Sequence, residues 1–200
     1  MPRSHTALLP LLLTLLALSA CSGGELVGVY VNLAKDGSGK LTTRALVEPK
    51  ADGPAEVRVG GVEWTGRAAL VSRQGTFARI NDVTLAGTGV RFSTPGSDDR
   101  PSLRVYVQRG PGAEWVRGLV PDETARRAMA RIYDPTGKTN EIGDTIRLEI
   151  ALPTDVVTSG VLPAGRGLEA AREGRRAYLL IPVRTALEAG EELVWDISWK

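Results

Sequence analysis

Apolar and polar residues alternate with a period of two in many short segments of the chain. Such alternation is typical of β-strands that bury one face, because successive side chains of a strand point to opposite sides of the sheet. Segments 27–33, 103–107, 146–152 and 193–199 show this pattern most clearly. One polar face also argues against a parallel sheet covered on both sides. We therefore expect an all-β protein: an antiparallel β-sandwich, immunoglobulin-like or related.

Residues that form turns separate the alternating segments. Asp36-Gly37-Ser38-Gly39 predicts a hairpin, and the returning strand is expected at 41–47. Further short strands are expected at 57–59, 62–64, 69–73, 76–80, 83–86, 90–92, 115–120 and 178–183. This spacing of short strands favours a sandwich over folds in which strands alternate with long helices.

One short helix is expected at Pro121–Ile132. Proline stands at its start, and Asp122 and Glu123 fall in the first turn, where negative charge is favourable. The C-terminal half of this segment also alternates, so a strand there is the alternative. The glycine-rich stretch 160–174 predicts a loop with one helical turn at Leu168–Arg172.

Turn-forming residues dominate the segment 93–101. This segment separates a β-rich stretch at 25–93 from a second one at 102–200, which also contains the helix. The two stretches are either two small modules or parts of one domain, and both interpretations stay open.

Residues 1–20 show the three zones of an export signal. Arg3 supplies positive charge, an apolar run extends from Leu8 to Leu18, and small residues follow. As a helix the run would rise only about 16 Å, which is well short of the ~30 Å hydrocarbon core of a bilayer. A cleavable signal is therefore favoured over a membrane span.

The sequence Leu18-Ser19-Ala20-Cys21 resembles the lipobox of bacterial lipoproteins. The resemblance covers only the leader. It implies that residues 1–20 are a signal peptide and that Cys21 becomes the N-terminus, carrying a diacylglycerol on sulfur and an acyl chain on nitrogen. That covalent lipid is the only cofactor we expect. A plain secretory signal with an incidental cysteine is the alternative.

The same resemblance implies a place for the protein in the cell envelope. Ser22, rather than Asp, follows the cysteine, which implies the outer membrane, facing the periplasm, in a bacterium with two membranes. In an organism with one membrane, the outer face of the plasma membrane is implied. Residues 21–24 form a short tether, so the folded part is expected close to its first partner, the lipid bilayer.

Cys21 and His5 are the only cysteine and the only histidine of the chain. After removal of the leader, the mature chain would have no histidine and no free thiol. This excludes a Ser-His-Asp triad, a Cys-His nucleophile, imidazole metal sites and a disulfide. Acid–base catalysis by carboxylates remains chemically open, but no pair among the 23 Asp and Glu residues stands out. We therefore expect no enzymatic activity.

The near balance of charge also excludes classes of partner. The whole chain carries 25 Lys and Arg against 23 Asp and Glu, without a long run of one sign. A nucleic-acid partner is excluded, because such proteins present a basic face. Two local basic groups either face anionic lipid or form a solvated, salt-bridged face, which we favour. They are Arg126, Arg127 and Arg131, and Arg172, Arg175 and Arg176.

Three tryptophans are candidate contacts for a ligand or partner, namely Trp64, Trp115 and Trp199. Exposed tryptophans offer flat platforms to a sugar or a protein, whereas buried ones fill a core. Trp195 shares the parity of Leu193 and Ile197, and the core interpretation is favoured for the group as a whole. Trp199 is the strongest candidate for exposure.

One loop gathers oxygen ligands. Asp134, Asn140, Glu141 and Asp144 would suit calcium, although an ordinary solvated loop is favoured. Asp36-Gly37-Ser38-Gly39 lacks a terminal glutamate in register and is interpreted as a turn. Gly137-Lys138-Thr139 lacks the first glycine and the following helix of a phosphate-binding loop, so a hairpin loop is favoured over a phosphate site there.

These features together predict a lipid-anchored cell-envelope β-sandwich with a non-catalytic binding or structural role towards an envelope protein or glycan. An alternative is an adaptor-like component of a transport assembly. Residues 130–152 resemble the β-domains of efflux adaptor proteins, in which an Asp-Pro-x-Gly turn precedes a strand, but the long helical hairpin is missing. A carboxylate-dependent glycan hydrolase is the third interpretation.

Overall fold

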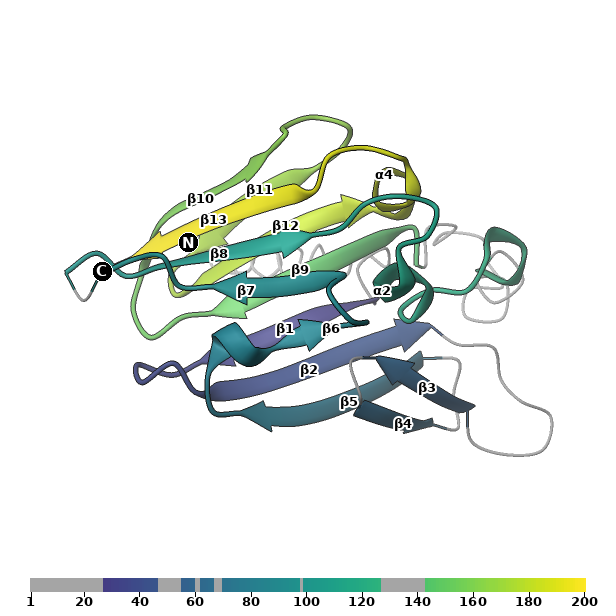
Figure 1. Cartoon of the computed structure of the whole chain (residues 1–200), viewed down its shortest axis with the longest axis horizontal. Coiled ribbons are helices and arrows are strands. Elements are labelled where there is room, and N and C mark those ends of the chain that lie inside the picture. The colour runs from purple at the N-terminus through teal and green to yellow at the C-terminus, as the bar shows by residue number, and fades with distance from the viewer. Residues whose placement is uncertain (1–26, 47–54, 60–61, 67–69, 98, 127–142) are drawn as a thin grey trace, which may run out of the picture.

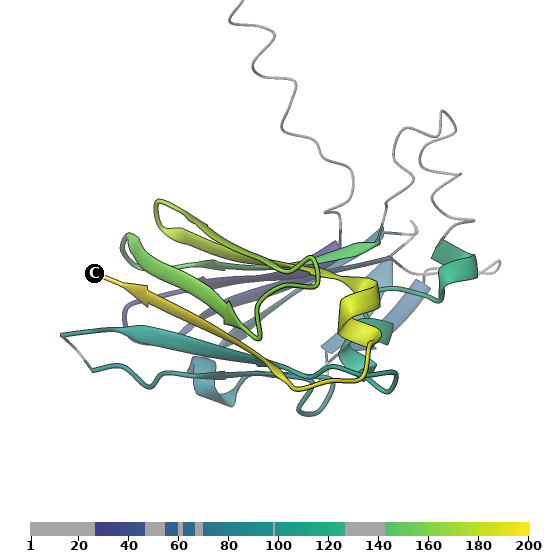
Figure 2. The same ribbon diagram turned by 90° about the horizontal axis from the view of Figure 1, so that it is seen from above.

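Two β-sheets lie face to face in the computed structural model, which describes residues 27–46, 55–59, 62–66, 70–97, 99–126 and 143–200 (Figures 1 and 2). The six-stranded sheet has the order β11 (Glu169–Glu173), β12 (Arg176–Pro182), β9 (Thr145–Ala151), β1 (Val27–Leu33), β2 (Gly39–Leu46) and β5 (Leu70–Phe77). The five-stranded sheet has the order β10 (Val156–Leu162), β13 (Leu193–Trp199), β8 (Ser102–Val107), β7 (Val90–Ser93) and β6 (Thr84–Leu85). The expected all-β sandwich is confirmed.

The remaining elements are short. β3 (Ala55–Val59) and β4 (Val62–Gly66) pair with each other as a two-stranded ribbon. A 3-10 turn, η2 (Ile80–Asp82), follows β5. Two helices, α2 (Glu114–Arg117) and α4 (Val183–Leu187), lie at one end of the sandwich, on the right in Figure 1. Residues 123–126 are also helical, which agrees with the start of the helix expected at Pro121–Ile132; the rest of that segment lies outside the described residues.

The core lies between the two sheets and is built by the period-two pattern. In β1, Val27, Val29, Val31 and Leu33 are all buried and point inward. The inward positions of the facing sheet, such as Val105 of β8, are equally buried. Burying such aliphatic side chains contributes about 1.5–3 kcal/mol each relative to exposure, which makes this alternation the main source of the stability of the fold.

The outer faces of both sheets carry paired polar side chains. On the six-stranded sheet, Arg147 stacks over Tyr178, with its guanidinium 4.5 Å from the ring centroid, and pairs with Glu149 at 2.9 Å. On the five-stranded sheet, Arg104 Nε donates to Asp196 at 2.6 Å. The Arg147–Tyr178 and Arg104–Asp196 contacts join neighbouring strands and stabilise the sheets, while the Arg147–Glu149 pair lies within β9.

One strand pair is parallel. β1 pairs with β9 so that Val27 lies beside Ile146 and Val31 beside Ile150, whereas β1 and β2 are antiparallel. This departs from the purely antiparallel sandwich expected from the sequence, and it distinguishes the fold from immunoglobulin domains, whose two sheets are antiparallel. Gly28 makes the close approach possible, because a Cβ there would lie 2.3 Å from the carbonyl oxygen of Arg147.

Strands from both sides of the segment 93–101 contribute to each sheet. β1, β2 and β5 join β9, β11 and β12, while β6 and β7 join β8, β10 and β13. The buried apolar residues of the two stretches form one continuous cluster. The two β-rich stretches therefore share a single core.

Three local predictions are wrong. The expected strand at 115–120 contains α2, because Trp115, Val116, Leu119 and Val120 are all buried and follow a helical spacing rather than alternation. The glycine-rich stretch 160–174 contains the end of β10 and all of β11, so no helical turn forms at Leu168–Arg172. The two strands expected at 69–73 and 76–80 are one strand, β5, followed by η2.

Candidate functional site

A groove runs along α4 at the end of the sandwich where β9 begins and β12 ends. We call it the α4 groove. Its polar part has a volume of about 570 Å³ and is lined by residues 121–123, Arg126, Asp144, Thr145 and residues 182–184 and 187. An apolar part of about 450 Å³ continues from Pro121, Asp122 and Leu187 towards Val116 and Val120. The groove is thus amphipathic.

Helix α4 is fixed in place by its neighbours. It begins directly after Pro182, buries Val183 and Ala186, and leaves Arg184 exposed. The Thr185 hydroxyl donates to the carbonyl oxygen of Arg166 at 2.7 Å. The amide N–H of Gly110 donates to the carbonyl oxygen of Ala186 at 2.9 Å, which ties the helix to the end of β8.

Arg109 provides a second, buried tie to α4. Its side chain is only 2% exposed. Nε donates to the carbonyl oxygen of Thr185 at 3.0 Å, and Nη2 donates to Glu188 at 3.3 Å. Glu188 also pairs with Arg166 Nη1 at 2.6 Å. A buried guanidinium is stable here because its donors are used by a carbonyl and a carboxylate.

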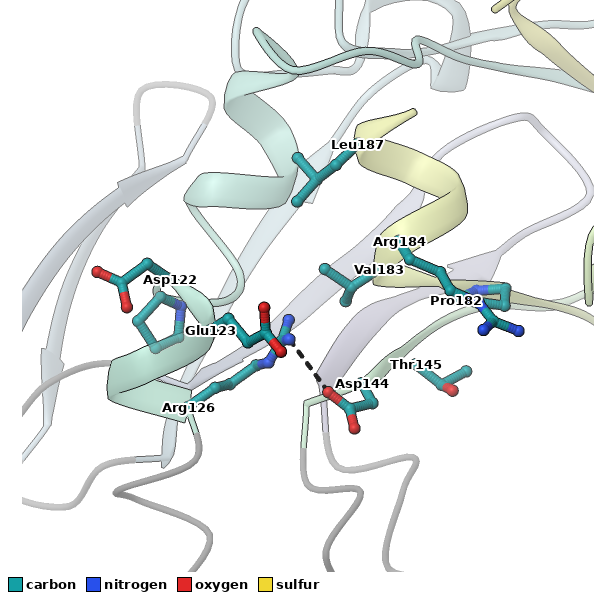
Figure 3. A pocket seen from close by; sticks show the side chains of 10 residues that line it. Asp122, Glu123, Arg126, Asp144, Thr145, Pro182, Val183, Arg184 and Leu187 are labelled. Atoms are coloured by element: carbon teal, nitrogen blue, oxygen red, sulfur yellow. Dashed lines mark ion pairs between the residues drawn. The ribbon is translucent and has the colours of Figure 1, made fainter. Parts of the chain in front are cut away.

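Arg126 lies at the centre of the polar part (Figure 3). Its Nη2 pairs with Asp144 at 3.2 Å, and its side chain is 12% exposed. Its Nε is buried and has no hydrogen-bond partner among the residues that the structure describes. The side chain passes over Gly143, whose φ is +76°, and a Cβ at that glycine would lie 3.2 Å from Arg126 Cδ. The glycine thus both forms the turn and leaves room for the arginine.

Carboxylates of the groove have structural roles. The Asp122 carboxylate accepts a hydrogen bond from the amide N–H of Ala125 at 2.9 Å, as the cap of the helical residues 123–126. Asp144 pairs with Arg126, and Glu123 points towards the same arginine in Figure 3. These contacts hold the helical residues 123–126 and the Arg126 side chain in place.

The calcium candidates are only partly described. Asp144 is the partner of Arg126, while Asp134, Asn140 and Glu141 lie outside the described residues. Within the described part of the chain, no group of three or more His, Cys, Asp or Glu side chains could hold a metal ion. Residues 130–142 of the adaptor-like stretch also lie outside it, and its C-terminal part contains β9.

The tryptophans differ in their surroundings. Trp115 is fully buried and its Nε1 donates to the carbonyl oxygen of Gln108 at 2.8 Å, so its candidacy as a surface contact is wrong and it is a core residue. Trp195 is also fully buried. Trp64 lies in β4, where side chains are outside the description. Trp199 is partly buried and packs against the core from the rim of a second pocket.

This second pocket, the Trp199 pocket, lies at the end of the sandwich opposite the α4 groove. Its volume is about 470 Å³, and its polar lining includes Lys35, Asp36, Ser97 and Thr154. The pKa of Asp36 lies below its ordinary value, because the Ser38 hydroxyl and amide donate to its carboxylate at 2.6 and 3.0 Å. The amide N–H of Trp199 donates to the carbonyl oxygen of Pro101 at 3.3 Å, which ties the backbone at Trp199 to the residue before β8.

The two groups of arginines expected from the sequence differ in their contacts and positions. Arg172 Nη1 donates to the carbonyl oxygen of Val156 at 2.6 Å, and Arg175 Nε donates to that of Leu152 at 3.1 Å. These two arginines therefore hold neighbouring segments together. Arg126 lines the α4 groove, while Arg127 and Arg131 lie outside the described residues.

Sequence reasoning missed the α4 groove. Its walls come from residues 111–126, 144–145 and 182–187, which only the folded sheet brings together. A local signal existed: Val183, Ala186 and Leu187 follow a helical spacing directly after a proline. It was hidden because Val183 also continues the alternation of β12.

Comparisons with known proteins add little. No protein-family model matches the chain, and no curated protein matches it. Among solved structures, the chain is similar to the folded domain of LppM from Mycobacterium tuberculosis, determined by NMR, over 88% of this chain and 92% of that one. The identity is 14% and the TM-score 0.39. A likeness of this size says nothing about ligand or activity.

Among the described residues, there is no helix with the length and apolar character needed to cross a bilayer.

Proposed function

We propose that this protein is a lipid-anchored β-sandwich of the cell envelope with a non-catalytic binding role, and that its ligand site is the Trp199 pocket. The proposal is supported by the direction of β1, which runs from one end of the sandwich to the other. The strand begins at Val27, close to the α4 groove, and ends at Leu33, which lines the Trp199 pocket. An anchor at Cys21 therefore enters one end of the sandwich and leaves the partly exposed tryptophan at the other.

The lining of the Trp199 pocket favours a glycan as the ligand. A sugar ring has an apolar face, which stacks on an indole, and hydroxyls that need donors and acceptors. Trp199 offers the flat surface, Asp36 offers a carboxylate and Ser97 a hydroxyl, while the Thr154 hydroxyl already donates to the carbonyl oxygen of Lys200. Asp36 is held by two hydrogen bonds from Ser38, which suits it to accept from a ligand hydroxyl and not to transfer protons.

Lipid attachment is tested by Cys21→Ser in a bacterial host fed radiolabelled palmitate. We expect labelling and membrane retention to be lost, because the substituted oxygen cannot form the thioether. Ser22→Ala, one position away, is the control and should be labelled like the natural chain. Labelled, membrane-bound Cys21→Ser protein would contradict the lipid anchor.

Ligand binding is tested by screening the purified protein against envelope glycans, with Trp199→Ala and Trp199→Phe compared side by side. Loss of the ring should weaken binding about tenfold, whereas phenylalanine should keep most of it. Val157→Ala, at an exposed position of β10, is the control for a general surface change. Equal binding by Trp199→Ala would overturn this site, and turnover of any glycan would overturn the non-catalytic role.

A further inference from the structure

We infer that a pocket between α4 and the loop before β11 binds the dianion of a phosphate group. We call it the Arg184 pocket. It has a volume of about 400 Å³ and is lined by Arg166, Gly167, Arg184, Thr185 and Glu188. It shares only Arg184 with the polar part of the α4 groove. The inference rests neither on the lipid anchor nor on the glycan site proposed above.

The loop that carries Arg166 is held against α4. The Thr185 hydroxyl donates to the carbonyl oxygen of Arg166 at 2.7 Å, and Thr185 itself is buried. Gly165, Arg166 and Gly167 all have positive φ angles, of 95°, 56° and 76°. A Cβ at Gly167 would lie 3.1 Å from Cγ of Pro182, so the loop passes close to the start of α4. The pocket is therefore built from two segments that the fold already joins.

Positive charge exceeds negative charge at the pocket. Oε2 of Glu188 accepts from Arg166 Nη1 at 2.6 Å and from the buried Arg109 Nη2 at 3.3 Å. One carboxylate thus serves two guanidiniums, and Arg184 adds a third positive charge. Three arginines against one glutamate leave an excess of two positive charges, which attracts an anion.

Arg184 is available to a ligand. It is exposed, and its side chain has no hydrogen bond or ion pair with any residue that the structure describes. Figure 3 shows this side chain extending past Pro182, away from Asp122 and Glu123. The Arg166 side chain is 52% exposed, so a second guanidinium lies at the same opening. Both arginines therefore present N–H donors to a ligand in the pocket.

The charge and the donors select a phosphate dianion. A phosphate monoester carries a charge of about −1.5 to −2 at pH 7 and has three strong acceptor oxygens. This charge matches the excess at the pocket, whereas a carboxylate would neutralise only half of it. A guanidinium donates two parallel N–H bonds to phosphate oxygens, and the pocket offers two such groups. The group recognised is a terminal phosphate, either free or on an organic ester.

Binding is tested by amide NMR titration of the purified protein with inorganic phosphate, in about 0.15 M salt, which screens unspecific attraction. Arg184→Gln should weaken binding about fivefold, because a pair of charged donors is lost. Arg79→Gln is the control, since it removes an exposed arginine of the segment before η2. Equal binding by Arg184→Gln and the natural chain, or equal weakening by both variants, would overturn the site.

Glu188→Gln gives an effect of the opposite sign. Glutamine keeps a side-chain oxygen that accepts from Arg109 and Arg166, but it removes the negative charge of the pocket. We expect phosphate to bind about threefold more tightly, because the repulsion from the carboxylate is gone. A loss of folding cannot produce tighter binding. Unchanged or weaker binding by this variant would overturn the charge argument.

The ligand class is tested with acetate, glycerol and glycerol phosphate in the same titration. Acetate carries one charge and should need a concentration about tenfold higher than phosphate. Glycerol alone should leave the resonances of residues 166–167 and 184–188 unchanged. Equal affinity for acetate would overturn the dianion, and a glycerol shift at these residues would overturn an anion site. Tighter binding of glycerol phosphate supports an organic ester as the ligand, and equal binding supports the phosphate group alone.

Discussion

At the residue scale, Arg109 shows how one buried charge supports the groove. Its guanidinium donates to the Thr185 carbonyl and to Glu188, while Gly190 gives it room, since a Cβ there would lie 2.8 Å from Nη1. Together with the Thr185–Arg166 and Gly110–Ala186 hydrogen bonds, this side chain holds the α4 helix in position. The groove depends on a residue that does not line it.

Arg109→Met should reduce the free energy of unfolding by about 2 kcal/mol, because the Thr185 carbonyl would be left buried without its donor. Arg79→Met is the matched control, since the Arg79–Asp82 pair is 76% and 59% exposed. Its loss should change stability by less than about 0.5 kcal/mol. Urea denaturation of both variants measures the difference, and equal stabilities would contradict the role of Arg109.

Asp36 gives a prediction about pH. Its pKa in the folded protein is below the ordinary value of 3.8, because Ser38 donates two hydrogen bonds to the charged form. The stabilisation is therefore present above the ordinary pKa and is lost as the pH falls through the lowered pKa. Ser38→Ala removes the hydroxyl donor and should raise the pKa of Asp36 towards 3.8. Carboxyl-carbon NMR titration measures this, and an unchanged midpoint would contradict the cause assigned.

At the scale of elements, the parallel pair β1–β9 depends on Gly28. Gly28→Ala should destabilise the protein by about 2 kcal/mol or more, because the new methyl group would lie 2.3 Å from the Arg147 carbonyl oxygen and the strands would have to separate. Gly75→Ala in β5 is the control, since a Cβ there meets nothing within 4 Å. Thermal unfolding of both variants tests the pair, and a similar loss of stability in the two would contradict it.

The elements also show what the sequence can and cannot predict. The predicted ends of β1, β8 and β13 lie within one residue of the observed ends. Each of these strands buries one face, so apolar and polar residues alternate along its whole length. β11 was missed because it is an edge strand with no fully buried side chain, so it carries no alternation. α2 was missed because the burial of neighbouring Trp115 and Val116 is set by the surrounding tertiary structure.

The candidate sites also include one that the sequence predicts and one that it does not. Trp199 was singled out from its type and its place in the chain, and the structure places it at a pocket. The α4 groove was not predicted, because Arg126, Asp144 and Arg184 belong to three separate segments. Asp144 and Arg184 are brought together by the pairing of β9 with β12, which sets Thr145 beside Pro182, and no local pattern encodes that pairing.

At the scale of the whole molecule, the shared core predicts that neither β-rich stretch folds alone. A fragment of residues 25–93 lacks β9, and a fragment of residues 102–200 lacks β1 and β7. Each fragment would expose one side of a half-built core, so we expect narrow amide dispersion in NMR spectra of both and a single unfolding transition for residues 25–200. A well-dispersed spectrum from either fragment alone would contradict a common core.

The β1–β9 pair also sets the order of events during biosynthesis. β2 reaches β1 through a short turn, but Ile146 must be synthesised before it can meet Val27. Contacts between residues so distant in sequence carry a high loop-closure cost and slow folding. Until then, β1 presents an unpaired edge on the side away from β2, the kind of edge that templates aggregation. This edge therefore stays exposed in the nascent chain until β9, which comes late in the sequence, has been synthesised.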